Sequence, residues 1–104
     1  MVKILLVEDD PFLIDIYTTK FKEMGFAIAS VADGGQAIRR VEEEKPDIIL
    51  LDIVLPNLDG WDILKKLKEN SETKKIKVVI LSNLGQPPEV EKALTLGADK
   101  YLIK

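Results

Sequence analysis

The residues best suited to chemistry each follow or end a short apolar segment of the chain. Three kinds of side chain are involved, carboxylate, hydroxyl and ammonium, at Glu8, Asp9, Asp52, Ser82 and Lys104. The chain has no cysteine and no histidine, which excludes disulfides, thiolate zinc sites and imidazole acid–base catalysis. Oxygen donors alone favour a hard cation, and a few carboxylates with room for water favour magnesium.

These groups could share one reaction. Several carboxylates brought together stay ionised when a cation lies among them. A lysine can hold a phosphate oxygen as a point charge, and a serine hydroxyl can donate to another. A carboxylate nucleophile can form an acyl phosphate, while metal and lysine offset the charge on the transferring group. The set therefore predicts an aspartate that accepts phosphate.

Simpler roles account for other acids in the chain. Asp10, Asp33 and Asp59 come just before expected helices, and we expect them to act as helix caps. Asp52 is harder to explain structurally, because it ends a strongly apolar segment and apolar residues 53–55 follow it. A charge placed beside a buried strand is costly without a partner.

Apolar segments and turn signals predict alternating strands and helices. The expected strands are 4–7, 26–31, 47–52, 77–82 and 99–103, and the expected helices are about 11–24, 34–44, 60–70 and 87–96. The first helix has its apolar residues at Leu13, Ile16, Tyr17, Phe21 and Met24. This alternation favours an open, doubly wound α/β fold with a parallel sheet and right-handed crossovers. Ligands of such sheets bind beyond the carboxyl ends of the strands, where the chemical residues are expected.

Length and composition set broad limits. The chain has 104 residues and a net charge of −3, which predicts one domain over residues 1–104 with no electrostatic reason to bind nucleic acid or an anionic membrane. No apolar run approaches the ~20 residues that a membrane helix needs. We therefore expect a cytoplasmic domain without membrane or nucleic-acid partners.

The sequence resembles response-regulator receiver domains of the CheY-like type over essentially its whole length. Four blocks carry the resemblance, in the family's order and spacing: residues 4–10, 46–60, 79–82 and 97–104. The resemblance implies five parallel strands in the flavodoxin-like order 2-1-3-4-5. It also implies a fifth helix that this chain lacks, so we expect a truncated domain with four helices. Apolar surface on strands one, three, four and five should then be partly exposed.

The resemblance also implies a metal and phosphoacceptor site. Asp52 would be the phosphoacceptor. Asp9 would bind Mg²⁺ directly and Glu8 through a water molecule. The backbone carbonyl of Val54 would complete the ligands from the protein, together with the Asp52 carboxylate.

Further roles follow from the same resemblance. Ser82 and Lys104 would bind the phosphoryl group and act in catalysis with Asp52. Ser82 and Tyr101 would form the switch that responds to phosphorylation. The surface formed by the expected helix 87–96 and strand 99–103 would then change, and bind a downstream target or a second copy of the chain.

The implied donor is a phosphohistidine on a sensor histidine kinase or a histidine phosphotransfer protein. The absence of histidine from this chain agrees with a donor on another chain. Domains of this family catalyse their own phosphorylation and dephosphorylation, so whether the chain counts as an enzyme depends on definition. The expected function is a phosphorylation-dependent signalling switch.

Some residues depart from the family pattern and leave alternatives open. Asn83 stands where the family has a small residue. Val54 and Leu84 are apolar at the positions that border the attacking water in the family, and this predicts slow self-dephosphorylation. Asn83 and the missing helix favour a phosphorylation-inactive interaction module or scaffold fragment. A flavodoxin-like cofactor domain is disfavoured because the loop after the first strand is acidic. A phosphatase with an aspartate nucleophile is also disfavoured, because its usual second aspartate would fall at Val54.

Overall fold

The computed structural model describes residues 1–53, 55, 59–82 and 86–103. Strands and helices alternate throughout, as the sequence predicts: β1 (Lys3–Val7), α1 (Pro11–Glu23), β2 (Ala27–Val31), α2 (Gly34–Glu44), β3 (Ile48–Asp52), α3 (Gly60–Glu69), β4 (Lys77–Ser82), α4 (Pro87–Thr95) and β5 (Lys100–Ile103). The longest helix, α1, has 13 residues. None of the helices in these ranges has the length and apolar character needed to cross a membrane.

The five strands form one parallel sheet in the order β2-β1-β3-β4-β5. This confirms the predicted flavodoxin-like order. In the sheet, Val7 of β1 lies opposite Leu51 of β3, and Asp52 of β3 lies opposite Leu81 of β4. The carboxyl ends of these three central strands therefore meet at one edge of the sheet.

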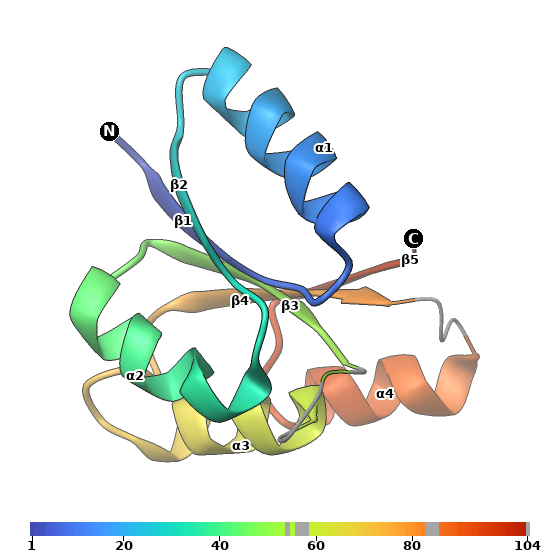
Figure 1. Cartoon of the computed structure of the whole chain (residues 1–104). Coiled ribbons are helices and arrows are strands. Elements are labelled where there is room, and N and C mark those ends of the chain that lie inside the picture. The colour runs from blue at the N-terminus through green and yellow to red at the C-terminus, as the bar shows by residue number, and fades with distance from the viewer. Residues whose placement is uncertain (54, 56–58, 83–85, 104) are drawn as a thin grey trace.

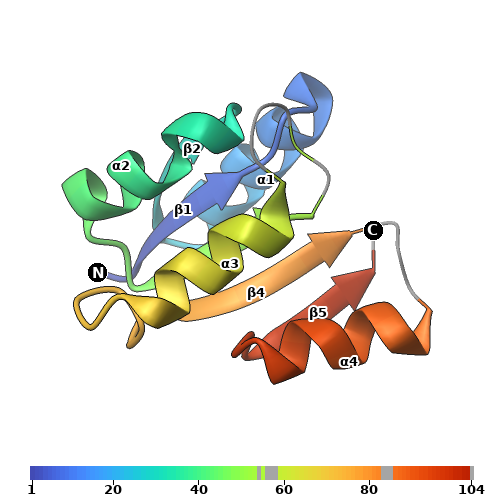
Figure 2. The same cartoon turned by 90° about the horizontal axis from the view of Figure 1, so that it is seen from below.

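The helices cover the two faces of the sheet unequally. In Figure 1, α1 lies on one face, while α2, α3 and α4 lie on the other. Figure 2 shows the face with three helices from below. The larger core lies on that face and joins the sheet to α2, α3 and α4 through Leu5, Val7, Ala37, Val41, Ile49, Leu51, Ile63, Leu64, Leu67, Val78, Ile80 and Ala93.

Three aspartates cap helices, as predicted. The side chains of Asp10, Asp33 and Asp59 each accept a backbone N–H two or three residues further on, at 2.9, 2.7 and 3.0 Å. They are the N-caps of α1, α2 and α3. A capping carboxylate satisfies an N–H that the helix itself leaves without a partner.

The predicted apolar face of α1 is partly wrong. Ile16 and Met24 were expected to be part of it, but they are 45% and 60% exposed. The side chains that pack on the sheet are Ile14, Tyr17 and Phe21. Their spacing of three and then four residues forms one stripe on the helix. Ile16 lies outside that stripe, and Met24 is the C-cap residue beyond the end of α1 at Glu23.

The prediction of partly exposed apolar surface on the α1 face is correct for β5, and for Ile48 of β3 and Val79 of β4, which are half-buried. On β1, β3 and β4 it is wrong for Ile4, Leu6, Leu50 and Leu81, which are at most 6% exposed. The partly buried apolar side chains of α1 and of the neighbouring strands pack against these four residues. On β5, at the edge of the sheet, Leu102 is 47% exposed.

Candidate functional site

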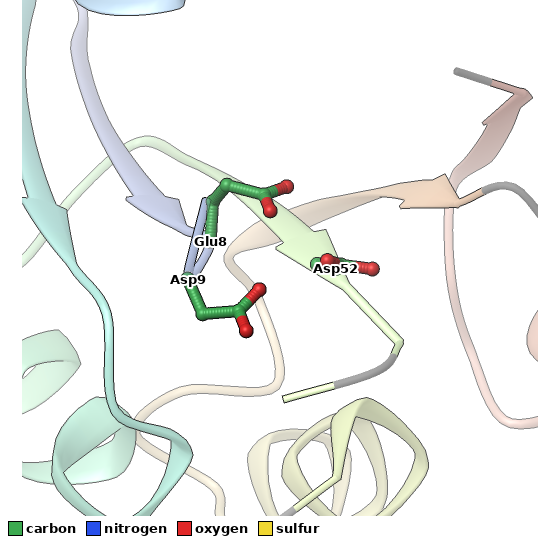
Figure 3. Close-up of side chains that lie close together, drawn as sticks. All are labelled: Glu8, Asp9 and Asp52. Carbon is green, nitrogen blue, oxygen red and sulfur yellow. The ribbon is translucent and has the colours of Figure 1, made fainter. Parts of the chain in front are cut away.

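Three carboxylates meet at the carboxyl edge of the sheet. Glu8 and Asp9 directly follow β1, and Asp52 is the last residue of β3. Because Val7 lies opposite Leu51, one further residue along each strand brings Glu8 beside Asp52. One carboxylate oxygen from each of the three residues lies within 4.8 Å of the others. Figure 3 shows the carboxylates of Glu8 and Asp9 extending to the side on which Asp52 lies.

The cluster is buried toward the protein and open toward solvent. Glu8 is 1% exposed and Asp52 is 5% exposed, whereas Asp9 is exposed. Glu8 Oε1 accepts the backbone N–H of Asp10 at 3.2 Å, which helps to orient the carboxylate. Burying ionised carboxylates side by side is costly unless a positive charge accompanies them. The arrangement suits a cation that enters from the side of Asp9.

The spacing of these oxygens fits a small divalent cation. Two ligands on opposite sides of Mg²⁺ lie about 4.2 Å apart, because each Mg–O bond measures about 2.1 Å. Oxygens within 4.8 Å of one another reach that geometry with small side-chain rotations, or with a water molecule between one of them and the metal. Hard oxygen ligands are the donors that magnesium prefers.

Ser82 and Tyr101 lie on the two strands beyond β3. Ser82 ends β4 and is 1% exposed. Since Asp52 lies opposite Leu81, Ser82 is one residue beyond the position beside Asp52. Tyr101 is half-buried, lies opposite Ile80 of β4, and packs against the core on the α2–α4 face. The structure therefore brings Ser82 to the edge that carries the acids and places Tyr101 on the adjoining strand.

Two of the predicted site residues, Val54 and Lys104, lie outside the described residues. The same holds for Asn83 and Leu84, on which the expected departures from the family depend. Their predicted roles stay predictions.

One residue at this edge has a contact that the sequence did not reveal. Gly60 was predicted only to begin a helix, and it is indeed the first residue of α3. In the structure its backbone N–H also donates to the carbonyl oxygen of Ile53 at 2.6 Å. The sequence predicts that a helix begins at this glycine, but it does not show which strand the glycine packs against.

Comparisons with known proteins agree with this geometry. The DNA-binding response regulator MtrA of Mycolicibacterium smegmatis is 36% identical over 102 residues, which are 98% of this chain and 43% of MtrA. The Mn²⁺-bound form of the response regulator Rcp1 is 29% identical with a TM-score of 0.92, over 100% of this chain and 81% of that chain. The phosphorylated cyanobacterial phytochrome response regulator RcpA is 29% identical with a TM-score of 0.91, over 99% and 80%.

The chain spans less than half the length of curated relatives such as MtrA, at 43%. The family model described as the response regulator receiver domain matches residues 4–104, which include all three clustered acids and all of the strands except the first residue of β1. Sequence, strand order and the position of the acids thus agree, and the chain belongs to the response regulator receiver domain family.

Proposed function

We propose that this receiver domain is a phosphorylation-dependent switch in which Asp52 accepts the phosphoryl group. The observation that carries the proposal is the meeting of Asp52 with Glu8 and Asp9 within 4.8 Å at the carboxyl edge of the sheet. Two similar receiver structures support it, because one is described as phosphorylated and the other as Mn²⁺-bound.

The residues that would hold Mg²⁺ are Glu8, Asp9 and Asp52, with the backbone carbonyl of Val54 as a further ligand. The exposed Asp9 lies on the solvent side of the cluster, and the buried Glu8 lies behind it. Bound Mg²⁺ would supply positive charge that offsets the charge on the transferring phosphoryl group.

In the transfer, a carboxylate oxygen of Asp52 forms a bond to the phosphorus of a phosphohistidine on a histidine kinase or a phosphotransfer protein. The P–N bond breaks, and its electron pair stays on the imidazole nitrogen, which takes up a proton. The Ser82 hydroxyl would donate to one phosphoryl oxygen, and the Lys104 ammonium would hold another. This chain has no histidine, so the donor histidine would lie outside these 104 residues.

The output surface would be the one formed by α4 and β5. Tyr101, on β5, would respond to Ser82 as it turns toward the phosphoryl group. Apolar side chains are exposed on this surface, with Leu94 of α4 at 48% and Ile103 of β5 at 63%. Such a surface suits a downstream protein or a second copy of the chain.

The experiment that tests the proposal is phosphorylation by acetyl phosphate, followed by intact mass, with Mg²⁺ and with chelator. The wild-type chain should gain one phosphoryl group only when Mg²⁺ is present, and Asp52→Ala should gain none. Asp47→Ala is the matched control, because Asp47 precedes the same strand at its other end. That variant should be phosphorylated as the wild type is.

The alternative is a receiver fold that only binds a partner. A folded wild-type chain that binds Mg²⁺ and yet gains no phosphoryl group would favour this second function. The predicted slow loss of the phosphoryl group can be tested in the same assay, since Val54→Asn should shorten its lifetime. An unchanged lifetime would contradict that prediction. The expected truncation of the domain and its cytoplasmic location stay predictions.

A further inference from the structure

Gly60 packs directly against the backbone that follows the proposed phosphoacceptor. Its N–H donates to the carbonyl of Ile53 at 2.6 Å. A Cβ atom on Gly60 would lie 2.5 Å from the Ile53 Cα and 3.0 Å from the Asp52 carbonyl carbon, and nearer still to the Asp52 carbonyl oxygen. Ordinary van der Waals contact begins at 3.4 Å. Any side chain at position 60 would therefore collide with the backbone of Asp52 and Ile53.

Backbone conformation does not explain a glycine at this position. Gly25 and Gly97 have positive φ angles of 91° and 106°, a region that favours glycine. Gly60 is not among the positive-φ residues; it has helical backbone as the first residue of α3. Glycine is a poor helix former, so helix propensity does not explain it either. The lack of space beside the backbone of Asp52 does.

Neither side of this contact can move away freely. The body of α3 is anchored by Ile63, Leu64 and Leu67, which are at most 1% exposed. On the other side, β3 is hydrogen-bonded between β1 and β4. A side chain at position 60 would consequently displace the peptide that joins Asp52 to Ile53, where the strand ends.

We propose that Gly60 is a positioning residue for the metal and phosphoacceptor site. By letting the first turn of α3 lie against the Asp52–Ile53 peptide, it holds the Asp52 carboxylate in register with Glu8 and Asp9. Magnesium demands near-ideal octahedral geometry, and functional side chains need to be held within about 0.5 Å. The inference rests on the proposed function and names a residue on which the geometry of that site depends.

The test compares Gly60→Ala with Gly25→Ala. Gly25 lies in the turn between α1 and β2, and a Cβ there meets nothing within 4 Å. Its positive φ makes alanine strained, so this control loses stability without contact with the site. Each folded variant is titrated with Mg²⁺ by calorimetry and phosphorylated with acetyl phosphate. We expect Gly60→Ala to bind Mg²⁺ at least about tenfold more weakly and to react more slowly, and Gly25→Ala to retain wild-type affinity and rate.

Wild-type affinity and rate in Gly60→Ala would overturn the positioning role while leaving the proposed function intact. A wild-type chain that neither binds Mg²⁺ nor accepts phosphate would overturn the proposed function, and the positioning role with it.

Hydrogen exchange on the wild-type chain gives a second measurement that does not require Gly60→Ala to fold. If the contact positions Asp52 for the metal, Mg²⁺ must in turn stabilise the contact. Mg²⁺ should then slow exchange of the Gly60 amide more than that of the Gly25 amide, which donates to Lys22. Equal slowing of both amides would overturn the role.

Discussion

At the amino edge of the sheet, the carboxylates of Glu44, Asp47 and Asp99 each meet a cation or a backbone N–H. Glu44 lies 2.6 Å from the Lys3 ammonium, Asp47 accepts the Lys3 amide at 2.8 Å, and Asp99 accepts the Val78 amide at 2.9 Å. At the carboxyl edge, Glu8 accepts the Asp10 amide at 3.2 Å, but three carboxylate oxygens also lie within 4.8 Å of one another. One edge uses its acids to hold the fold, whereas the other gathers acids at a cost that a bound cation would offset.

The largest effect should come from removing one charge of the acidic cluster. Asp9→Asn is expected to weaken Mg²⁺ binding about 100-fold, or about 2.7 kcal/mol, because it removes a charged oxygen ligand. Isothermal calorimetry measures this. The matched control is Asp10→Asn, since Asp10 caps α1 and asparagine is an equally good N-cap. An equal loss of Mg²⁺ affinity in both variants would contradict the assignment of Asp9 as a metal ligand and of Asp10 as a helix cap alone.

At the amino edge, Asp99→Ala should lower stability without changing Mg²⁺ affinity. Val78 is fully buried and its N–H donates to Asp99, so the variant leaves a buried donor without its acceptor, at a cost of about 1 to 3 kcal/mol. Urea unfolding with chelator present measures the loss. Asp47→Ala should cost less, because the hydrogen bond that it removes is exposed. Equal losses in the two variants would show that burial does not decide the effect.

In the absence of metal, neutralising an acid at the carboxyl edge should raise stability, whereas Asp99→Ala at the amino edge should lower it. Asp9→Asn should raise the free energy of unfolding by less than about 1 kcal/mol, because it removes repulsion between like charges at an exposed position. Unfolding in urea with chelator compares it with the wild type, and added Mg²⁺ should reverse the order. A metal-free Asp9→Asn less stable than the wild type would mean that Asp9 supports the fold itself.

The two edges also differ in how far the sequence predicts them. The acids of the carboxyl edge follow from the pattern of apolar strands, because parallel strands place their carboxyl ends together. The caps Asp10, Asp33 and Asp59 follow equally from local sequence, and all three were correct. Local signals of this kind need no knowledge of tertiary packing.

The parts that could not be predicted depend on contacts between distant segments. The exposure of Ile16 depends on how α1 is rotated over the sheet, which the spacing of apolar residues alone does not fix, and the exposure of Met24 depends on where the helix ends. The close contact of Gly60 with Asp52 depends on where α3 lies. At the amino edge, Lys3 and Glu44 are 41 residues apart in the sequence, and nothing local pairs them.

The smallest predicted effect concerns that ion pair and its response to pH. The hydrogen bond from the Lys3 ammonium, followed by its charge, lowers the pKa of Glu44 below the ordinary value of 4.5. A lowered pKa in the folded state stabilises the protein above the unfolded value, and the contribution is lost as the pH falls through the lowered pKa. Lys3→Gln should therefore be less stable than the wild type at about pH 6, and the difference should vanish toward about pH 3. Urea unfolding at both values measures it, with Lys65→Gln on α3 as the control for loss of a lysine. A difference that stayed constant with pH would mean that Lys3 acts through packing of its side chain and not through the charge of Glu44.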